Sequence, residues 1–505
     1  MAHGTSHANS RVLAPRSKFY QGPYGRICSD LPPWAPPGIP EQEIPDHLLD
    51  IAKTEMIEAP GKTPTEIARD DALRQQLEDQ FSSSIPAGYT YFGQFIDHDI
   101  TFDPASSLMR FNDPSGLLNH RTPRLDLDNV YGRGVDDQPY LYDNDDKAKL
   151  LIGQVGGSNL RDLPRNGQGR ALIGDMRNDE NSMVCQIQLA FLLAHNTLVD
   201  RARGTGSATP FEDARRTLRW LYQHIVWNDF IRRIAVDDVY KCALKKIKTC
   251  DKRNTWEHCL KDVYTWKNMP FMPVEFSVAA YRFGHSMVRN AYQTNHPHRG
   301  FGNFVPIFDS SDGDDPDDLR GFRPLKQENY IQWDWFLDMT SSNGPFPQLA
   351  RKIDTKLANS LAHLHEDTDG SPMNVLAFRN LLRSVRFELP SGSDVARKFG
   401  LNPIAIAPDR DALWFYILKE AEGLPGQNAG QMLGRLGSLI VCATFAGLLK
   451  GDPNSYFNIF PDWTPSDDPL LDGANDNIDP GDWTLSSIIR LAGLPVGADD
   501  ITSQS

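Results

Sequence analysis

The chain has 505 residues, and its 52 basic and 66 acidic side chains give a formal net charge of −14 at pH 7. This charge argues against a general nucleic-acid or anionic-membrane binder, because such partners need a positive field. With 40% hydrophobic and 23% charged residues, the composition is that of a globular protein rather than a disordered or fibrous one.

The N-terminal segment, residues 1–85, is rich in proline and glycine, most clearly in the stretch LPPWAPPG that begins at Leu31. Because these residues interrupt regular structure, we expect an extended arm that packs on the body of the protein. The opening residues MAHGTSHANSRVLAPRS contain no apolar core of the signal-peptide type. Sec-dependent export is therefore not expected, and the compartment stays open: cytoplasmic, or exported without a signal peptide.

Helical periodicity dominates from about residue 180 onward. Apolar side chains recur three or four positions apart within 187–198 and 218–230, which is typical of amphipathic helices. Further helices are expected over 275–292, 375–386, 411–421 and 430–450.

The longest apolar run covers residues 436–449. It is shorter than the about 20 residues that cross a bilayer, so it is predicted to be a buried helix. Strand-like alternation is sparse and short, and the predicted class is therefore mainly α. We expect one large helical domain over 86–460, preceded by the arm and followed by a tail over 461–505 that packs on the same domain.

Two polar motifs lie in or beside predicted helices. The first reads GQFIDHD over residues 93–99, and on a helix Gln94 and His98 would lie on one face. The second reads GDMRNDEN over residues 174–181, where Arg177 and Glu180 are three positions apart. Acidic residues are common at a helix start because they favour its dipole, but that interpretation gives no reason for the arginine.

A third motif reads AAYRFGHSMVR over residues 279–289. His285 follows Arg282 by three positions, so both could address one bound group from a single helical face. The alternative is a buried histidine among surface arginines.

A fourth motif reads RTPRLDLDNVYG over residues 121–132. Thr122, Asp126 and Asp128 offer hard oxygen ligands of the kind that calcium takes. The spacing differs from the twelve-residue EF-hand loop, and a plain turn is the alternative.

Together and in this order, the four motifs resemble those of the animal-type haem peroxidases, the peroxidase–cyclooxygenase superfamily. The resemblance covers roughly residues 85–460 and extends to the segment LWFYILKEAE that begins at Leu413. It implies a large helical haem-peroxidase domain. It also implies an enzyme that reduces hydrogen peroxide and oxidises small donors, such as halides, thiocyanate or phenols, through an oxoferryl intermediate.

The resemblance assigns the catalytic roles to four residues. His98 matches the distal base and Arg177 the distal arginine. Gln94 matches the distal glutamine that holds water or a halide near the iron, and His285 matches the proximal ligand of the haem iron. A neutral histidine can move protons near pH 7, and a fixed guanidinium can stabilise charge on the departing oxygen.

The resemblance also implies how the cofactor is held. Asp97 and Glu180 match carboxylates that become esterified to haem in mammalian members, so the implied cofactor is an ester-linked derivative of haem b. Asn181 stands where some members have a methionine joined to a haem vinyl group, so that link and strong chloride oxidation are not expected. Arg282 matches the residue that points to a haem propionate, and Asn380 is the candidate acceptor for the ring N–H of His285.

For the fourth motif, the resemblance implies a structural calcium ion beside the distal histidine. The matching ligands are Asp99, Thr122, Asp126, Asp128 and the backbone carbonyl of Arg124.

Three other functions compete with a peroxidase. Cyclooxygenases and fatty-acid dioxygenases of the superfamily carry a radical-forming tyrosine three residues before the proximal histidine, where this chain has Arg282. An inactive peroxidase-like adhesion module would be favoured by loss of a distal or proximal residue, and none is lost. A calcium-binding structural protein would leave Arg177 and both histidines unexplained. The expected partners are therefore hydrogen peroxide and small anionic or aromatic donors, without nucleic acid or integral membrane association.

The chain has six cysteines, of which Cys242, Cys250 and Cys259 lie close together in sequence. They form no C-x-x-C pair, which disfavours a zinc site and leaves an isolated disulfide or free thiols.

Overall fold

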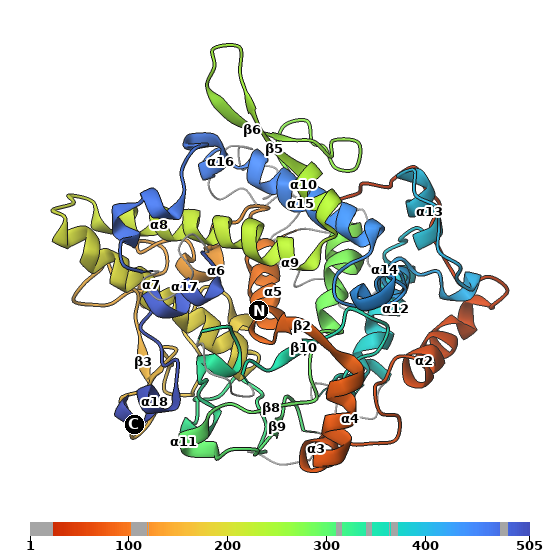
Figure 1. Ribbon diagram of the computed structural model, residues 1–505, viewed down its shortest axis with the longest axis horizontal. Coiled ribbons are helices and arrows are strands. Elements are labelled where there is room, and N and C mark those ends of the chain that lie inside the picture. The colour runs from red at the N-terminus through yellow and green to blue at the C-terminus, as the bar shows by residue number, and fades with distance from the viewer. Residues whose placement is uncertain are drawn as a thin grey trace.

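The computed structural model describes residues 24–102, 119, 121–309, 316–339, 346–362, 364, 372–474 and 483–504. Helices make up most of the molecule, and the strands form short, separate pairs (Figure 1). This architecture confirms the predicted mainly α class.

The α-helices follow one another along the whole described chain. They are α2 (Ile44–Thr54), α3 (Pro64–Arg69), α4 (Asp71–Phe81), α5 (Gly88–Ile100), α6 (Asp128–Tyr131), α7 (Ser182–Gly204), α8 (Pro210–Ile225), α9 (Arg232–Ile234), α10 (Asp237–Ala243), α11 (His296–Arg299), α12 (Leu376–Arg386), α13 (Gly392–Lys398), α14 (Leu413–Glu422), α15 (Arg435–Gly451), α16 (Tyr456–Ile459), α17 (Leu485–Leu491) and α18 (Ala498–Gln504).

The strands form five separate pairs, of which only β1 with β7 is parallel in the described chain. They are β1 (Tyr24–Gly25) with β7 (Met272–Pro273), β2 (Ser82–Pro86) with β10 (Leu349–Arg351), β3 (Gly153–Gln154) with β4 (Arg161–Asp162), β5 (Leu244–Lys248) with β6 (Asn254–His258), and β8 (Ala291–Tyr292) with β9 (Val305–Pro306).

The core forms where α5 packs on α7, on Tyr222 of α8 and on the π-helix η5 (Val226–Ile231) that continues α8. Phe95 of α5 stacks on Phe191 of α7 with ring centroids 4.5 Å apart, and Phe92 meets the ring of Phe230 edge-on at 5.8 Å. These buried rings occupy one side of α5. The opposite side of the helix is therefore free to present polar groups to a cavity.

The arm is not extended throughout, because residues 24–85 contain α2, α3 and α4. Pro64 is the first residue of α3, and Thr63 and Glu66 form a capping box around it. Proline is well suited to the first helical position, since the amide hydrogen it lacks would have no partner there. The prolines predicted to interrupt structure thus also start helices. The arm packs on the body through contacts of α2 with α12 and the pairing of β2 with β10.

The segment predicted as a helix over 275–292 has a more irregular form. It begins as a π-helix, η6 (Glu275–Ala279), and continues as a 3₁₀-helix, η7 (Ala280–His285). The chain then leaves helical geometry, because the carbonyls of Met287 and Asn290 accept hydrogen bonds from distant segments of the chain. Strand β8 follows at once.

The long apolar run 436–449 lies within α15, which is almost entirely buried, as predicted. Helix α7 is the one helix of the described chain that is long and apolar enough to cross a membrane by length and composition. Within its apolar window, 83% of the residues are buried inside the fold. It therefore resembles the core helix of a compact protein.

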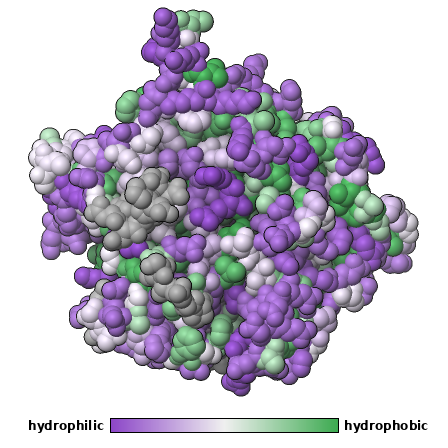
Figure 2. Space-filling model, viewed as in Figure 1, coloured by the Kyte–Doolittle hydropathy of each residue, from purple (hydrophilic) through white to green (hydrophobic). Residues whose placement is uncertain are grey.

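The β5–β6 hairpin projects from the body at the top of Figure 1. Cys250 lies in the turn of this hairpin, while Cys242 and Cys259 flank it, and all three thiols are free and exposed. The visible surface is mostly hydrophilic, with small, separate apolar patches (Figure 2).

Candidate active site

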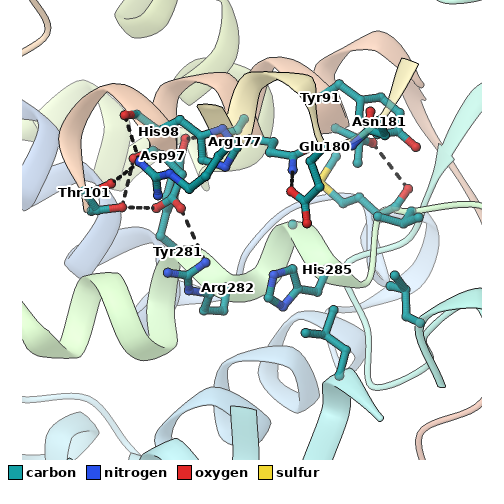
Figure 3. A pocket seen from close by; sticks show the side chains of 18 of the residues that line it. Tyr91, Asp97, His98, Thr101, Arg177, Glu180, Asn181, Tyr281, Arg282 and His285 are labelled. Atoms are coloured by element: carbon teal, nitrogen blue, oxygen red, sulfur yellow. Dashed lines mark hydrogen bonds and ion pairs between the residues drawn. The ribbon is translucent and has the colours of Figure 1, made fainter. Parts of the chain in front are cut away.

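A cavity of about 590 Å³ lies at the centre of the fold. Its volume is within the range of roughly 300–1,000 Å³ that is typical of ligand and cofactor sites. Side chains from α5 and from the turn before α7 form one wall, and side chains from η7 face them from the other (Figure 3). Seven of the predicted site residues line this cavity: Gln94, Asp97, His98, Arg177, Glu180, Arg282 and His285.

His98 is buried in the first wall with its ring held from one side. Its Nδ1 atom lies 2.7 Å from Oδ1 of Asn178, and Nε2 has no hydrogen-bond partner among the described residues. Burial and the nearby positive charge of Arg177 lower the pKa of His98 to about 4. The imidazole is therefore neutral at pH 7 and can accept a proton.

Arg177 projects from a short 3₁₀-turn, η4 (Met176–Asp179), and is fixed by Asp175. The Asp175 carboxylate accepts hydrogen bonds from Nε of Arg177 at 3.1 Å and from Nη2 at 2.7 Å. Nη2 also donates to the carbonyls of Thr101 and His98. No described residue accepts from Nη1, so this edge of the guanidinium remains available to a ligand.

The pKa of Asp175 is held below its usual range. Burial would raise the pKa, but the positive charges of Arg177 and Arg121 outweigh this effect. Asp175 is therefore an ionised carboxylate that holds the arginine in one orientation.

Gln94 is fixed between two residues that follow Arg177. Its Nε2 donates to Oε2 of Glu180 at 2.6 Å, and its Oε1 accepts from Nδ2 of Asn181 at 3.1 Å. Asn181 also caps α7 by accepting from the backbone N–H of Val184. A change at Asn181 would therefore affect both the cavity and the start of α7.

The opposite wall is organised by η7. In a 3₁₀-helix residues three apart are eclipsed, so Arg282 and His285 face the same way (Figure 3). Burial and the positive charges of Arg282 and Arg383 lower the pKa of His285 to about 3. His285 is thus neutral, which is the form that binds metal ions.

The side-chain amide of Asn380, on α12, lies 2.8 Å from Nδ1 of His285. Nδ2 of the amide faces the ring, whereas the buried Oδ1 has no partner in the described structure. Amide oxygen and nitrogen differ little in shape. A half-turn of the amide lets Oδ1 accept from a protonated Nδ1 and leaves Nε2 of His285 free to act as a ligand.

Asp97 connects the two walls. Its Oδ1 accepts from the hydroxyl of Thr101 at 2.9 Å, and its Oδ2 lies 3.4 Å from Nη1 of Arg282 (Figure 3). Burial opposes ionisation, but the positive charges of Arg282 and Arg177, together with His98 and the hydrogen bond from Thr101, outweigh it and lower the pKa of Asp97. The side chain is therefore a carboxylate at neutral pH.

A group of arginines faces the cavity beside His285. Arg282, Arg379 and Arg383 all line it. Burial and repulsion from the other two arginines lower the pKa of Arg383 to about 9. Because no described side chain forms an ion pair or hydrogen bond with Arg383, this wall is suited to an anionic ligand.

Behind the first wall, ligand oxygens of Asp99, Asp126 and Asp128 lie within 4.8 Å of one another. Oδ1 of Asp99 and Oδ1 of Asp126 are buried without hydrogen-bond partners in the described structure. Burial and mutual repulsion raise the pKa of Asp99 and raise that of Asp128 to about 7. Unsatisfied carboxylate oxygens of this kind fit a hard divalent cation.

Two further predicted ligands lie in the same loop. The hydroxyl of Thr122 donates to Oδ2 of Asp126 at 2.9 Å, and the N–H of Arg124 donates to the carbonyl of Thr122. The structure therefore brings Thr122 into the cluster and places Arg124 beside it.

Several supporting residues were not found by sequence reasoning. Asn178 and Asp175 stand inside the GDMRNDEN motif, but their spacing gives no sign that one contacts His98 and the other Arg177. Arg383 follows Asn380 by three positions, so the helical spacing of α12 could have suggested that both face His285.

Comparison with known proteins shows what the chain is similar to. The model of the animal haem peroxidase family matches residues 108–311. A peroxidase-like protein of Margaritifera margaritifera is 27% identical over 263 residues, which cover 40% of this chain and 32% of that relative. The chain thus matches about a third of the relative's length.

Two solved structures share the fold. Peroxidase A from Dictyostelium discoideum aligns with a TM-score of 0.57 and 14% identity, covering 94% of each chain. The fatty acid alpha-dioxygenase of Oryza sativa aligns with a TM-score of 0.56 and 14% identity, covering 96% of this chain and 81% of that one. At this identity the two structures show that the chain shares their fold, and over residues 108–311 its sequence matches the animal haem peroxidase family.

Proposed function

We propose that the protein is a haem-dependent peroxidase that reduces hydrogen peroxide and oxidises small electron donors. One observation carries this proposal: His98 and His285 face a single cavity from opposite walls, each neutral, with Nδ1 beside an asparagine and Nε2 without a partner among the described residues. Arg177 lines the cavity on the His98 side only, so the two histidines stand in different surroundings.

The residues of the cavity fit haem. Nε2 of His285 would ligate the iron, and Arg282 and the otherwise unpaired Arg383 would bind the propionates. Asp97 and Glu180 are proposed to form esters with the macrocycle. Haem bound there would supply an iron at which peroxide is reduced and its oxidising equivalents are passed to a donor.

On the opposite wall, His98 and Arg177 have different roles in the proposed reduction of peroxide. Nε2 of His98 would accept a proton from one peroxide oxygen and return it to the other as water leaves. The open Nη1 edge of Arg177 would stabilise the negative charge that develops on the departing oxygen. Because Asp175 fixes the guanidinium beforehand, little reorganisation is needed during the reaction.

Small anions and phenols are the proposed donors. Gln94, one helical turn before His98, and Asn181 present amide groups to the same cavity, where a small anion or water could bind. Since Asn181 replaces the methionine of the strongest chloride oxidisers, we expect iodide, thiocyanate and bromide to be oxidised and chloride to be a poor substrate.

A structural calcium ion is proposed for the Asp99 cluster. The ligands would be the side chains of Asp99, Thr122, Asp126 and Asp128 with the carbonyl of Arg124. Asp99 directly follows His98 in α5. The ion would therefore also set the position of the catalytic base.

A fatty-acid dioxygenase is the second candidate, since that rice enzyme shares the fold. Against it, position 282 holds an arginine, so no phenol is available three residues before His285. Oxygenation of palmitate or linoleate without added peroxide would favour this candidate.

The proposal is tested by comparing His98→Ala with the parent protein. We expect peroxide-dependent oxidation of iodide and of a phenol to slow by about 10²–10⁴-fold, as is usual when a general acid–base group is removed. His195→Gln is a matched control, because His195 is equally buried but bonds to Tyr131 and Ala148 outside the cavity. Equal peroxide rates in His98→Ala and the parent would contradict the proposal.

A further inference from the structure

A series of buried hydrogen bonds leads from α7 to His98. Nε2 of Gln188 lies 3.4 Å from the backbone carbonyl of Asn129, and Oε1 of Gln188 lies 2.7 Å from Nδ2 of Asn178. Oδ1 of Asn178 then lies 2.7 Å from Nδ1 of His98. Asn178 and Gln188 are fully buried, so water does not compete for these groups.

The polarity of this series is determined at its far end. A backbone carbonyl can only accept a hydrogen bond, so Gln188 must turn its NH₂ group toward Asn129. The side-chain oxygen of Gln188 then faces Asn178, which must donate a hydrogen bond to it from the Asn178 NH₂ group. The oxygen of Asn178 consequently faces His98, and that oxygen can only accept.

Reversing either amide would bring two oxygens or two NH₂ groups into contact. Leaving a buried polar group unpaired in this way is strongly unfavourable. The hydrogen-bond series is therefore directional, and its direction requires a hydrogen on Nδ1 of His98.

We propose that Asn178 and Gln188 are positioning residues that hold His98 in the tautomer with its hydrogen on Nδ1. Nε2 is thereby kept unprotonated toward the cavity. The inference rests on the proposed peroxidase function, for which an unprotonated Nε2 is needed to accept the proton of peroxide. Neither amide touches the reacting atoms; both act through the imidazole.

The series also fixes the ring in space. His98 belongs to α5, Asn178 to η4 and Gln188 to α7, so three separate elements determine where Nε2 points. Without Asn178, the ring could rotate or carry its hydrogen on Nε2, and that form cannot act as the base. We expect the loss to be on the order of 10–100-fold, as for other partners that orient an imidazole.

Two measurements on the haem-loaded protein test the proposal. The first is the second-order rate constant for peroxide, compared with the KM for the donor. The second is the affinity for cyanide, which needs no turnover: hydrogen cyanide gives up its proton when it binds ferric haem, so its affinity reports an acceptor near the iron.

The informative variants are Asn178→Leu, which removes the acceptor, and Asn178→Asp, whose buried carboxyl group in its protonated form donates to Oε1 of Gln188 and keeps an oxygen for Nδ1. Asn178→Leu should lower both the peroxide rate constant and the cyanide affinity by 10–100-fold while the donor KM stays unchanged, and Asn178→Asp should recover most of both. Gln188→Met should give an intermediate loss, because Asn178 can then turn either end toward His98. Gln186→Met is the control, since Gln186 lies on the same helix and bonds instead to Ser182, Asn329 and Ile331.

The outcomes separate this inference from the proposed function. If the parent protein shows no peroxide-dependent oxidation, the proposed function fails. If the parent is active and Asn178→Leu matches it in both measurements, or if Asn178→Asp is as defective as Asn178→Leu, the positioning role is wrong. Should Asn178→Leu fail to bind haem, Gln188→Met decides by the same two measurements, and parental values in that variant overturn the proposal.

Discussion

Nη1 of Arg121 lies 3.1 Å from Oδ1 of Asp128, within the carboxylate cluster behind the cavity. The other edge of the same guanidinium bonds to Asp175, with Nε 3.1 Å from Oδ2. Asp175 in turn holds Arg177. The proposed calcium site and the arginine of the cavity are thus joined by one continuous chain of ion pairs, in addition to the direct sequence link between Asp99 and His98.

The first prediction concerns these linked ion pairs. In Arg121→Met, Asp175 loses one of its two arginine partners. Asp175 should then be free to move, and the orientation of the Arg177 guanidinium should become less well defined. We expect the rate constant for peroxide to fall by about tenfold, the lower end of the range for lost orienting partners, with unchanged donor KM. Stopped-flow kinetics would measure this, and Arg133→Met, an exposed arginine nearby in sequence, is the control. A parental rate in Arg121→Met would contradict it.

Removal of the cation should make stability depend on pH. Burial and repulsion from neighbouring carboxylates raise the pKa of Asp128 from 3.8 to about 7 and also raise that of Asp99. A carboxyl whose pKa is raised on folding stabilises the protein while protonated, and this contribution is lost as pH rises through the window from about 4 to about 7. The Tm of chelated protein should therefore fall across that window.

Calcium should reverse this fall, because it replaces the lost protons as the partner of the carboxylates. Thermal unfolding at pH 5 and pH 8, with calcium or with chelator, measures the effect. Asp126→Asn removes one repelling charge and should flatten the dependence in chelated protein. A chelated protein whose Tm is the same at both pH values would argue against a metal site here.

Arg383 provides a test of how haem is bound. It is a cation without a described ion-pair partner on the cavity wall, and a hydrogen bond to a charged group contributes about 1.5–3 kcal/mol. Arg383→Met should therefore bind haem roughly tenfold to hundredfold more weakly. Transfer of haem to excess apomyoglobin, from protein that has not been treated with peroxide and so carries no ester, measures the loss, with Arg386→Met, outside the cavity lining, as the control. If both variants release haem at the same rate, Arg383 has no special part in binding.

Covalent attachment is expected at both carboxylates. After treatment with peroxide, acidic organic solvent should leave haem on the polypeptide of the parent protein. Asp97→Asn and Glu180→Gln should each remove one link, and the double variant should release all haem. Mass spectrometry of proteolytic fragments would identify the linked peptides. Complete extraction of haem from the peroxide-treated parent would show that no ester forms.

Local spacing was enough to predict part of this site. Gln94 and His98 share a helix face, and the helix over 375–386 lies at almost the predicted residues. The resemblance added Asn380, whose contact with His285 spans 95 positions in the sequence. These features depend either on helical periodicity within one segment or on motifs known from relatives.

The features that were missed depend on tertiary contacts. Asn178 contacts His98 only because η4 lies beside α5, and no spacing within either segment encodes that distance. The predicted helix over 275–292 ends early because its later carbonyls accept hydrogen bonds from segments far along the chain. The arm was predicted as extended from its prolines, although Pro64 takes the first position of a helix.

The change of helical pitch between η6 and η7 has a consequence for engineering. A π-turn contains about one residue more than an α-turn, and such insertions are frequent at functional sites. Deleting one residue from η6 would therefore let it relax to an ordinary α-turn, while the residues beyond it keep nearly the same faces. Arg282 and His285 should still face the cavity in a chain shortened in this way. Deleting a residue within η7 instead would turn His285 away from Arg282, so the two turns of this segment should differ sharply in their tolerance of a change in length.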